Sequence, residues 1–263
     1  MDDVASARRE LAAEIRPGVL RPDWSAVTTP AAREALLRRM VVRAGLLDRW
    51  SHALEASEDL IWRTVLQLYA DRGRPPRPSE VAAETGVDPT RVQALLRNLQ
   101  LRDLIGLEPG ADAIRYAYPF TEAASGHKVE LRGRRIHALC AIDALGVGAM
   151  YRTDITIASS CRHCGETIRV TTRDEGHALQ SVAPAEAVVW YDFAYIGSAA
   201  SSCCPSIAFF CSDAHRVSWR DTRMQPSEGA CLTIGEALEL GRAVFGPVLI
   251  EPLGGSNADV DAE

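Results

Sequence analysis

Lysine is almost absent from this chain of 263 residues, since Lys128 is the one lysine among 29 basic residues. Chemistry that runs through a lysine Schiff base therefore has one candidate residue at most. The chain also lacks any apolar run near the roughly 18 residues that a membrane span needs. Its acidic start, Met1-Asp2-Asp3, is not followed by the apolar core of a signal peptide. These absences predict a soluble, cytoplasmic protein with no membrane partner.

An excess of positive charge is missing as well. The formal net charge of −6 at pH 7 argues against a strongly basic protein that binds polyanions, although a local basic patch would escape this measure. The composition is that of a globular protein, and the length suffices for one large domain or two modest ones with a real hydrophobic core.

The first half of the chain contains no cysteine, and all seven cysteines lie between Cys140 and Cys231. In a chain without a secretion signal, this distribution favours metal or thiol chemistry over disulfides. The two halves are therefore expected to have different tasks, with the chemistry in the second half.

The first half is predicted to be mainly helical. Residues 1–56 are predicted to form a helical extension whose apolar stripe includes Leu36, Leu37 and Met40. Residues 57–121 have the order of a winged helix-turn-helix: helices begin near Glu58, after an N-cap at Ser79 and at residue 89, and two short strands follow at 104–107 and 114–118.

A winged helix-turn-helix raises DNA binding as a possible function, and the charge of the segment counts against it. Residues 57–121 contain eight arginines and nine acidic residues. The predicted recognition helix and its end offer only Arg91, Arg97 and Arg102, few contacts for a protein that neutralises phosphates. We expect a structural or interaction role with no nucleic-acid partner, and a metal-sensing transcriptional regulator remains the alternative.

Residues 122–250 are predicted to form an α+β domain around a mixed or antiparallel sheet. Strands are expected at 128–131, 154–157, 166–172 and within 182–196, an apolar run stands at 207–211, and a last helix is expected at 233–244. The second and third of these strands form a hairpin whose turn contains Cys161 and Cys164. The small, acidic tail 251–263 is predicted to be disordered.

Cys140 and Asp143 stand three residues apart in the apolar stretch 135–145. On a helix these positions share a face, so the sulfur and the carboxyl group would lie side by side. A position in the first turns favours a thiolate, whereas desolvation raises the pKa of a carboxyl group. The pair therefore suits a soft nucleophile beside a proton donor, and the alternative is a core cysteine next to a solvated aspartate.

A structural zinc site is a second possibility, because zinc ribbons place their first two thiolates in a hairpin turn such as the one with Cys161 and Cys164. The adjacent Cys203 and Cys204 fit poorly as the second pair, since neighbouring cysteines rarely both bind one tetrahedral ion. Cys211 or His163 would have to substitute. By residue type, Cys211 and Cys231 are expected to be ordinary buried cysteines, and His137 and His215 to be surface or packing residues.

Taken in order, these features resemble the bacterial organomercurial (alkylmercury) lyases. The resemblance covers about residues 60 to 249. It rests on the winged-helix-like module, Leu139-Cys140-Ala141-Ile142-Asp143-Ala144-Leu145, Ser159-Ser160-Cys161 with Gly165, Val182-Ala183-Pro184, Cys203-Cys204 before Phe209-Phe210, Trp219, and the run from Gly235 to Gly241. The chain departs from the family pattern in its longer N-terminal extension and in Cys164, where a residue without a thiol is expected.

The resemblance implies protonolysis of the carbon–mercury bond of R–Hg⁺, which yields RH and Hg²⁺. It implies that Cys140 and Cys203 bind the mercury of substrate and product, and that Asp143 moves the proton and also contacts the product metal. Cys161 is implied to be structural and Cys204 dispensable. No cofactor is expected. Low-molecular-weight thiols, or hand-over to a mercuric reductase, would release the product.

Overall fold

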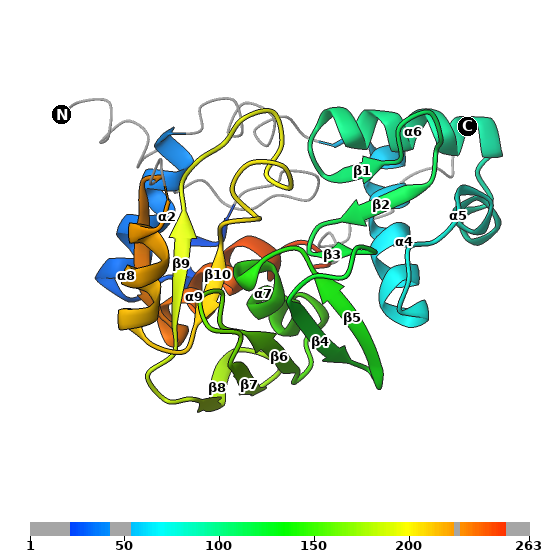
Figure 1. The fold of residues 1–263 in the computed structure, drawn as a ribbon. Helices are drawn as coiled ribbons and strands as arrows, with labels where there is room; N and C mark the ends of the chain where they lie inside the picture. Colours follow the sequence, from blue (N-terminus) through cyan, green and yellow to red (C-terminus); the bar gives the residue numbers. More distant parts are fainter. Residues whose placement is uncertain (1–21, 43–53, 224–226, 251–263) are drawn as a thin grey trace.

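A computed structural model describes residues 22–42, 54–223 and 227–250. Within these ranges the chain forms seven α-helices, one 3-10 turn (Trp24–Ala26) and two antiparallel sheets, so the predicted α+β class is confirmed (Figure 1). No helix in the described part of the chain is long and apolar enough to cross a membrane. Parts of the predicted N-terminal extension, and the tail predicted to be disordered, lie outside the described residues.

Residues 56–117 have the elements of a winged helix-turn-helix. The helices are α4 (Ala56–Arg72), α5 (Pro78–Thr85) and α6 (Pro89–Leu101), and the wing strands are β1 (Ile105–Leu107) and β2 (Ile114–Ala117). The start of α6 agrees with the prediction, since the Asp88 carboxylate accepts the first free backbone N–H groups. The predicted N-cap at Ser79 is wrong. The cap is Arg77, because Pro78 suits the first helical position and Glu80 accepts the backbone N–H of Arg77.

The larger sheet has eight strands in the order β1-β2-β3-β5-β4-β6-β7-β8. It therefore continues across residue 121, where the sequence predicted the end of the winged module. Beyond the wing, its strands are β3 (Phe120–Thr121), β4 (His127–Leu131), β5 (Arg134–Ala138), β6 (Thr156–Ser160), β7 (Thr167–Arg173) and β8 (Ala178–Ala183).

The smaller sheet has the order β10-β9-β11, formed by β9 (Val188–Asp192), β10 (Ala208–Phe210) and β11 (Gly229–Thr233). The remaining helices are α2 (Pro30–Val42), α7 (Ala141–Tyr151), α8 (Asp213–Asp221) and α9 (Ile234–Phe245). Helix α2 contacts α9 and β11, and α8 contacts β9 and β10 (Figure 1). The predicted apolar stripe of α2 is confirmed, since Leu36, Leu37 and Met40 are buried.

Helix α7 packs closely against α9 through two glycines. A Cβ atom on Gly146 would lie 2.8 Å from the carbonyl oxygen of Gly241 and 2.3 Å from the ring of Phe245. A Cβ atom on Gly241 would lie 2.7 Å from the backbone nitrogen of Gly146. The two backbones can approach this closely only because neither residue has a side chain, and this contact sets the position of α7.

Gly146→Ala is expected to destabilise the protein by about 1–3 kcal/mol, because the new methyl group overpacks a contact with backbone that cannot move aside. Thermal or urea unfolding measures the effect. Gly235→Ala is the matched control, since its Cβ would meet nothing closer than 3.9 Å and alanine favours helix over glycine. Equal stability of the Gly146 variant and the parent would contradict this account of the α7–α9 contact.

Candidate active site

Cys140 is the N-cap of α7, and its sulfur accepts the backbone N–H of Asp143 at 3.4 Å. The stretch 135–145 is therefore not one helix, as the shared-face argument assumed. Its first part alternates between exposed and buried side chains and is taken up by strand β5, which pairs with β3 and β4. The sulfur of Cys140 consequently lies at the N-terminus of α7, where free backbone N–H groups favour negative charge.

Asp143 and Cys204 complete a compact group with Cys140. Their ligand atoms all lie within 4.8 Å of one another, and the Cys204 thiol is 3.9 Å from Oδ2 of Asp143. The three residues are 2%, 5% and 4% exposed for Cys140, Asp143 and Cys204. The fold thus brings the Cys203-Cys204 pair to the start of α7, and it is Cys204 whose sulfur joins this group.

Cys203 is fully buried and its sulfur faces a guanidinium group. Nη2 of Arg39 lies 3.0 Å from Sγ of Cys203, while Nη1 donates to the carbonyl of Asp192 at 2.7 Å. The guanidinium also stands 4.5 Å from the ring centre of Tyr191. A buried cationic donor against a sulfur atom favours the thiolate form. Arg39 belongs to α2, in the extension for which no chemistry was predicted from the sequence.

Burial dominates the protonation of this group. Desolvation raises the pKa of Asp143 to about 7, despite the opposing hydrogen bond to Cys140, and it raises the pKa of Cys140 to about 11. Hydrogen bonds to Cys140 and Cys203, followed by burial, raise the pKa of Cys204. For Arg39, desolvation would lower the pKa, but the negative potential of Tyr191 and the cysteines raises it overall. A protonated Cys140 beside a carboxyl group that titrates near neutrality is arranged for proton transfer.

The winged helix-turn-helix holds the loop that carries the cysteine pair. Asp103 accepts the backbone N–H of Ala199 at 2.9 Å, and the hydroxyl of Tyr118 accepts that of Ala200 at 2.7 Å. Tyr118 in turn donates to Asp103 at 3.1 Å. Sequence analysis did not identify these residues, because only the fold brings them to residues about 80 to 100 positions further on. Through Asp103 and Tyr118 the helix-turn-helix module has a structural role, because it positions the loop that carries Cys203 and Cys204.

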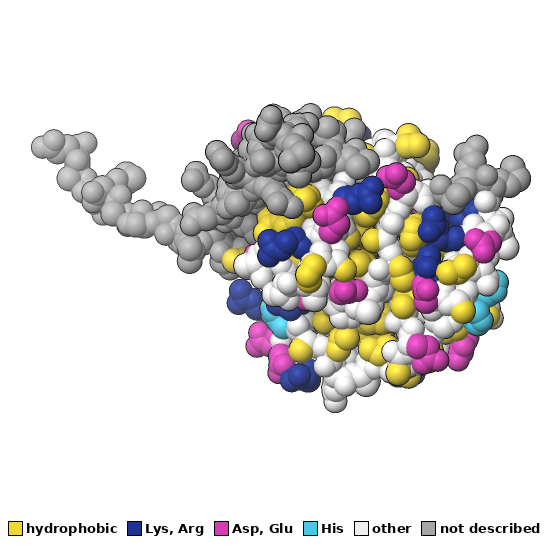
Figure 2. Space-filling model, turned by 90° about the vertical axis from the view of Figure 1, so that its left-hand side faces the viewer, with side chains coloured by type: hydrophobic (Ala, Val, Ile, Leu, Met, Phe, Trp, Pro, Cys, Tyr) yellow, Lys and Arg dark blue, Asp and Glu magenta, His cyan; other side chains and the backbone are white. Residues whose placement is uncertain are grey.

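Two of the three arginines on the predicted recognition helix and its end have acidic partners within the chain. Arg97 pairs with Asp112 at 2.9 Å, and Arg102 pairs with Glu58 at 2.9 Å. On the opposite side of the molecule, over α2 and α8, basic and acidic side chains of the described residues are interspersed with hydrophobic ones (Figure 2). The described residues of this face therefore carry charges of both signs, whereas nucleic acid favours a surface of one sign.

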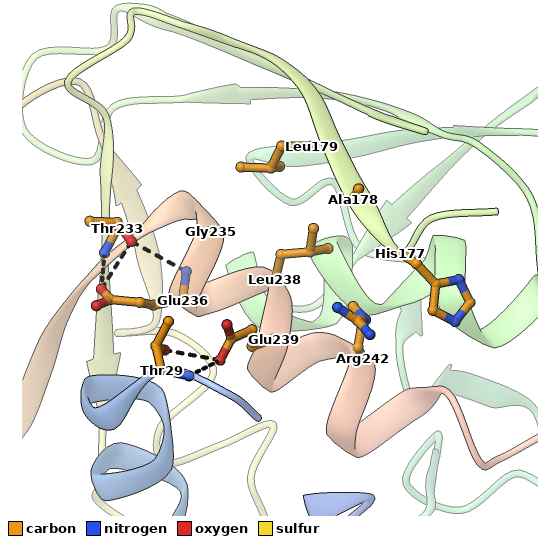
Figure 3. Close-up of a pocket in the computed structure, with 10 residues that line it drawn as sticks. All are labelled: Thr29, His177, Ala178, Leu179, Thr233, Gly235, Glu236, Leu238, Glu239 and Arg242. Atoms are coloured by element: carbon orange, nitrogen blue, oxygen red, sulfur yellow. Dashed lines mark hydrogen bonds between the residues drawn. The ribbon is translucent and has the colours of Figure 1, made fainter. Parts of the chain in front are cut away.

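Cys161, predicted to be structural, is buried in the β6–β7 turn and is not part of the group around Cys140. A pocket of about 370 Å³ (Figure 3) shares no lining residue with that group. No cysteine is among the described residues that line it. Its Glu239 accepts hydrogen bonds from Thr29, and its Glu236 from Thr233, so these acids anchor the segment before α2 and cap α9.

Comparison with known proteins identifies relatives of this arrangement. A family model described as alkylmercury lyase (MerB) matches residues 120–246. The alkylmercury lyase of Staphylococcus epidermidis is 29% identical over 187 residues, which cover 71% of this chain and 82% of that protein. The alkylmercury lyase of Bacillus cereus is 29% identical over 202 residues, covering 74% and 86%. A crystal structure of the mercury-bound form of MerB2 aligns with a TM-score of 0.65 and 26% identity, covering 80% of this chain and 98% of that chain.

Proposed function

Because the chain belongs to the alkylmercury lyase family, we propose that it cleaves the carbon–mercury bond of organomercurial cations by protonolysis. The reaction of R–Hg⁺ with two cysteine thiols yields the hydrocarbon RH, a dithiolate-bound Hg²⁺ and one proton. The observation that carries the proposal is a buried group of thiols around a carboxyl group whose pKa is raised to about 7. Mercury is soft, so thiolates select it over ordinary oxygen and nitrogen ligands.

The mercury is captured by Cys203 and Cys140. Cys203 attacks first, because the Arg39 guanidinium at 3.0 Å favours its thiolate. Cys140 follows as its proton passes to Asp143, which lies three residues further along the same helix. The second sulfur bond places negative charge on the mercury and so weakens its bond to carbon.

Asp143 then returns the proton to the departing carbon. A general acid or base is most effective when its pKa lies near the working pH, and burial provides this for Asp143. The carbon leaves as RH while both sulfurs keep the metal. Small external thiols would remove Hg²⁺ by exchange, or a mercuric reductase would receive it, and the protein needs no further cofactor for any of these steps.

A protonolysis assay tests the proposal. The full chain is incubated with phenylmercury and excess small thiol, and benzene is measured by gas chromatography. Cys140→Ser is expected to lower benzene release by at least about 10²-fold, the lower end of what one group acting on the reacting atoms contributes. Cys231→Ser is the matched control, since Cys231 is exposed and belongs to neither group of metal-ligand side chains. No benzene from the intact protein, or full release by the Cys140 variant, would refute the assignment.

A further inference from the structure

A second group of metal-ligand side chains lies apart from the proposed catalytic group. It consists of Cys161, Cys164, Cys211 and His215, whose ligand atoms all lie within 4.8 Å of one another. The two groups share no residue. We propose that these four side chains bind one Zn²⁺ ion in a tetrahedral, structural site, independently of the mercury chemistry.

The separations of the ligand atoms fit such a site. With Zn–S bonds of about 2.3 Å and a Zn–N bond of about 2.05 Å, tetrahedral geometry puts two sulfurs about 3.8 Å apart and a sulfur and a nitrogen about 3.6 Å apart. The sulfurs of Cys164 and Cys211 are 3.7 Å apart. Nδ1 of His215 is 3.9 Å from the sulfur of Cys161 and 2.8 Å from that of Cys211, distances that lie on either side of the sulfur–nitrogen value.

Backbone hydrogen bonds fix the turn and the helix start that carry these side chains. In the β6–β7 turn the N–H of Cys161 donates to Glu166 at 2.7 Å, and that of Gly165 donates to Cys161 at 2.9 Å. Gly165 has a φ of +79°, a conformation that favours glycine. The other pair, Cys211 and His215, is four residues apart, and the Ser212 side chain caps α8 and accepts the N–H of His215. These are the short spacings that zinc sites use.

The donor set selects the metal. Three thiolates and one imidazole disfavour Mg²⁺ and Ca²⁺, which take oxygen ligands, and suit Zn²⁺. Four protein ligands also fill the coordination shell, which is typical of structural rather than catalytic zinc. On binding, each cysteine that is still protonated releases its proton to solvent.

The ion would fasten the segment that leads to the cysteine pair. Cys211 directly follows strand β10, and the chain before that strand contains Cys203 and Cys204. The turn with Cys161 already reaches the strand, since the N–H of Arg162 donates to the carbonyl of Phe209 at 3.0 Å. Zinc would add a second link between turn, strand and α8 at the end remote from the cysteine pair.

Metal analysis of the full-length protein tests the site. Reduced protein purified without added chelator is expected to contain about one zinc per chain, measured by inductively coupled plasma mass spectrometry. Cys164→Ser should lower zinc affinity by at least about tenfold. Loss of a residue that only supports a ligand already lowers metal affinity by about tenfold or more, and loss of a ligand should cost at least as much. Cys164 is exposed, so this change leaves the core intact. After removal of zinc, Co²⁺ should give the intense absorption of a tetrahedral thiolate complex, weakened in His215→Asn.

Two control proteins assign the metal to this group. Cys231→Ser and the double variant Cys140→Ser/Cys204→Ser should both keep the zinc content and the Co²⁺ absorption of the parent. Loss of the metal in the double variant but not in Cys164→Ser would move it to the catalytic group and overturn the proposal. Metal-free reduced protein that gives no Co²⁺ absorption would overturn it too, as would a Cys164–Cys211 disulfide in zinc-free protein as purified.

Discussion

Asp143→Asn is expected to bind mercury in the same amount as the parent but to release hydrocarbon about 10²–10⁴-fold more slowly, the usual contribution of a general acid or base. Asparagine keeps the size of the side chain, while it can neither take the proton of Cys140 nor deliver it to carbon. Single-turnover benzene release measures the chemical step. Mercury retained after gel filtration measures capture. A variant that releases benzene at the parent rate would remove Asp143 from the reaction.

The stability of the same variant separates lost chemistry from lost folding. Burial raises the pKa of Asp143 from 3.8 to about 7, so the folded state holds the proton more tightly than the unfolded state. The stability that this proton contributes is complete at low pH and is lost as the pH rises from about 4 through about 7. The side chain of asparagine does not titrate in this range, so the variant does not lose stability in this way. The melting temperature of Asp143→Asn relative to the parent should therefore increase over this pH range.

The dependence of the parent enzyme's kcat/KM on pH should also show the titration of Asp143. In the proposed sequence the free enzyme needs Asp143 as a carboxylate that accepts the proton of Cys140. The value of kcat/KM, which reports the free enzyme, is therefore expected to rise as the pH passes through about 7. Asp143→Asn should lack this rise. A parent profile that falls over this range would mean that the carboxyl group must start protonated.

The sequence predicted best those elements whose ends are marked by local chemistry. Helix α6 starts where expected, because Asp88 followed by proline is a strong start signal. The predicted α7 began too early. The alternation of exposed and buried side chains in 134–138 is a strand signal, but an apolar, alanine-rich stretch also suits a helix, and only pairing with β4 decides between them. Helix α8 and strand β11 were not predicted at all.

The candidate site was predictable only in part, for a similar reason. Cys140 and Asp143 are close in sequence, so their proximity follows from the local backbone. The contact between Arg39 and Cys203 joins residues 164 positions apart, and no local pattern encodes it. Likewise, the spacing of Cys161 and Cys164 suggested a metal, and Cys211 was one of two candidates for a further ligand. His215 looked like a packing or surface residue, because only the fold brings it to the turn.

The cysteine pair allows the most direct test of which sulfur captures mercury. Cys204 is the one whose sulfur is grouped with Cys140 and Asp143, but its hydrogen bonds and burial raise its pKa and keep it a thiol. Cys203 faces the guanidinium of Arg39 instead. Because the thiolate is the form that binds metal, the charge of Arg39 decides in favour of Cys203 over the more central position of Cys204.

Cys203→Ser is therefore expected to lower benzene release by at least about 10²-fold. Cys204→Ser should cost less than about tenfold, since the serine hydroxyl can still form hydrogen bonds and the net loss is no more than about one hydrogen bond of 0.5–1.5 kcal/mol. Arg39→Met should lower the rate by about 10–100-fold, the equivalent of one charged hydrogen bond, and Arg39→Lys should restore part of it. Unfolding curves of all four variants identify any that fail to fold. An inactive Cys204 variant beside an active Cys203 variant would show that proximity to Asp143, and not the charge of Arg39, selects the nucleophile.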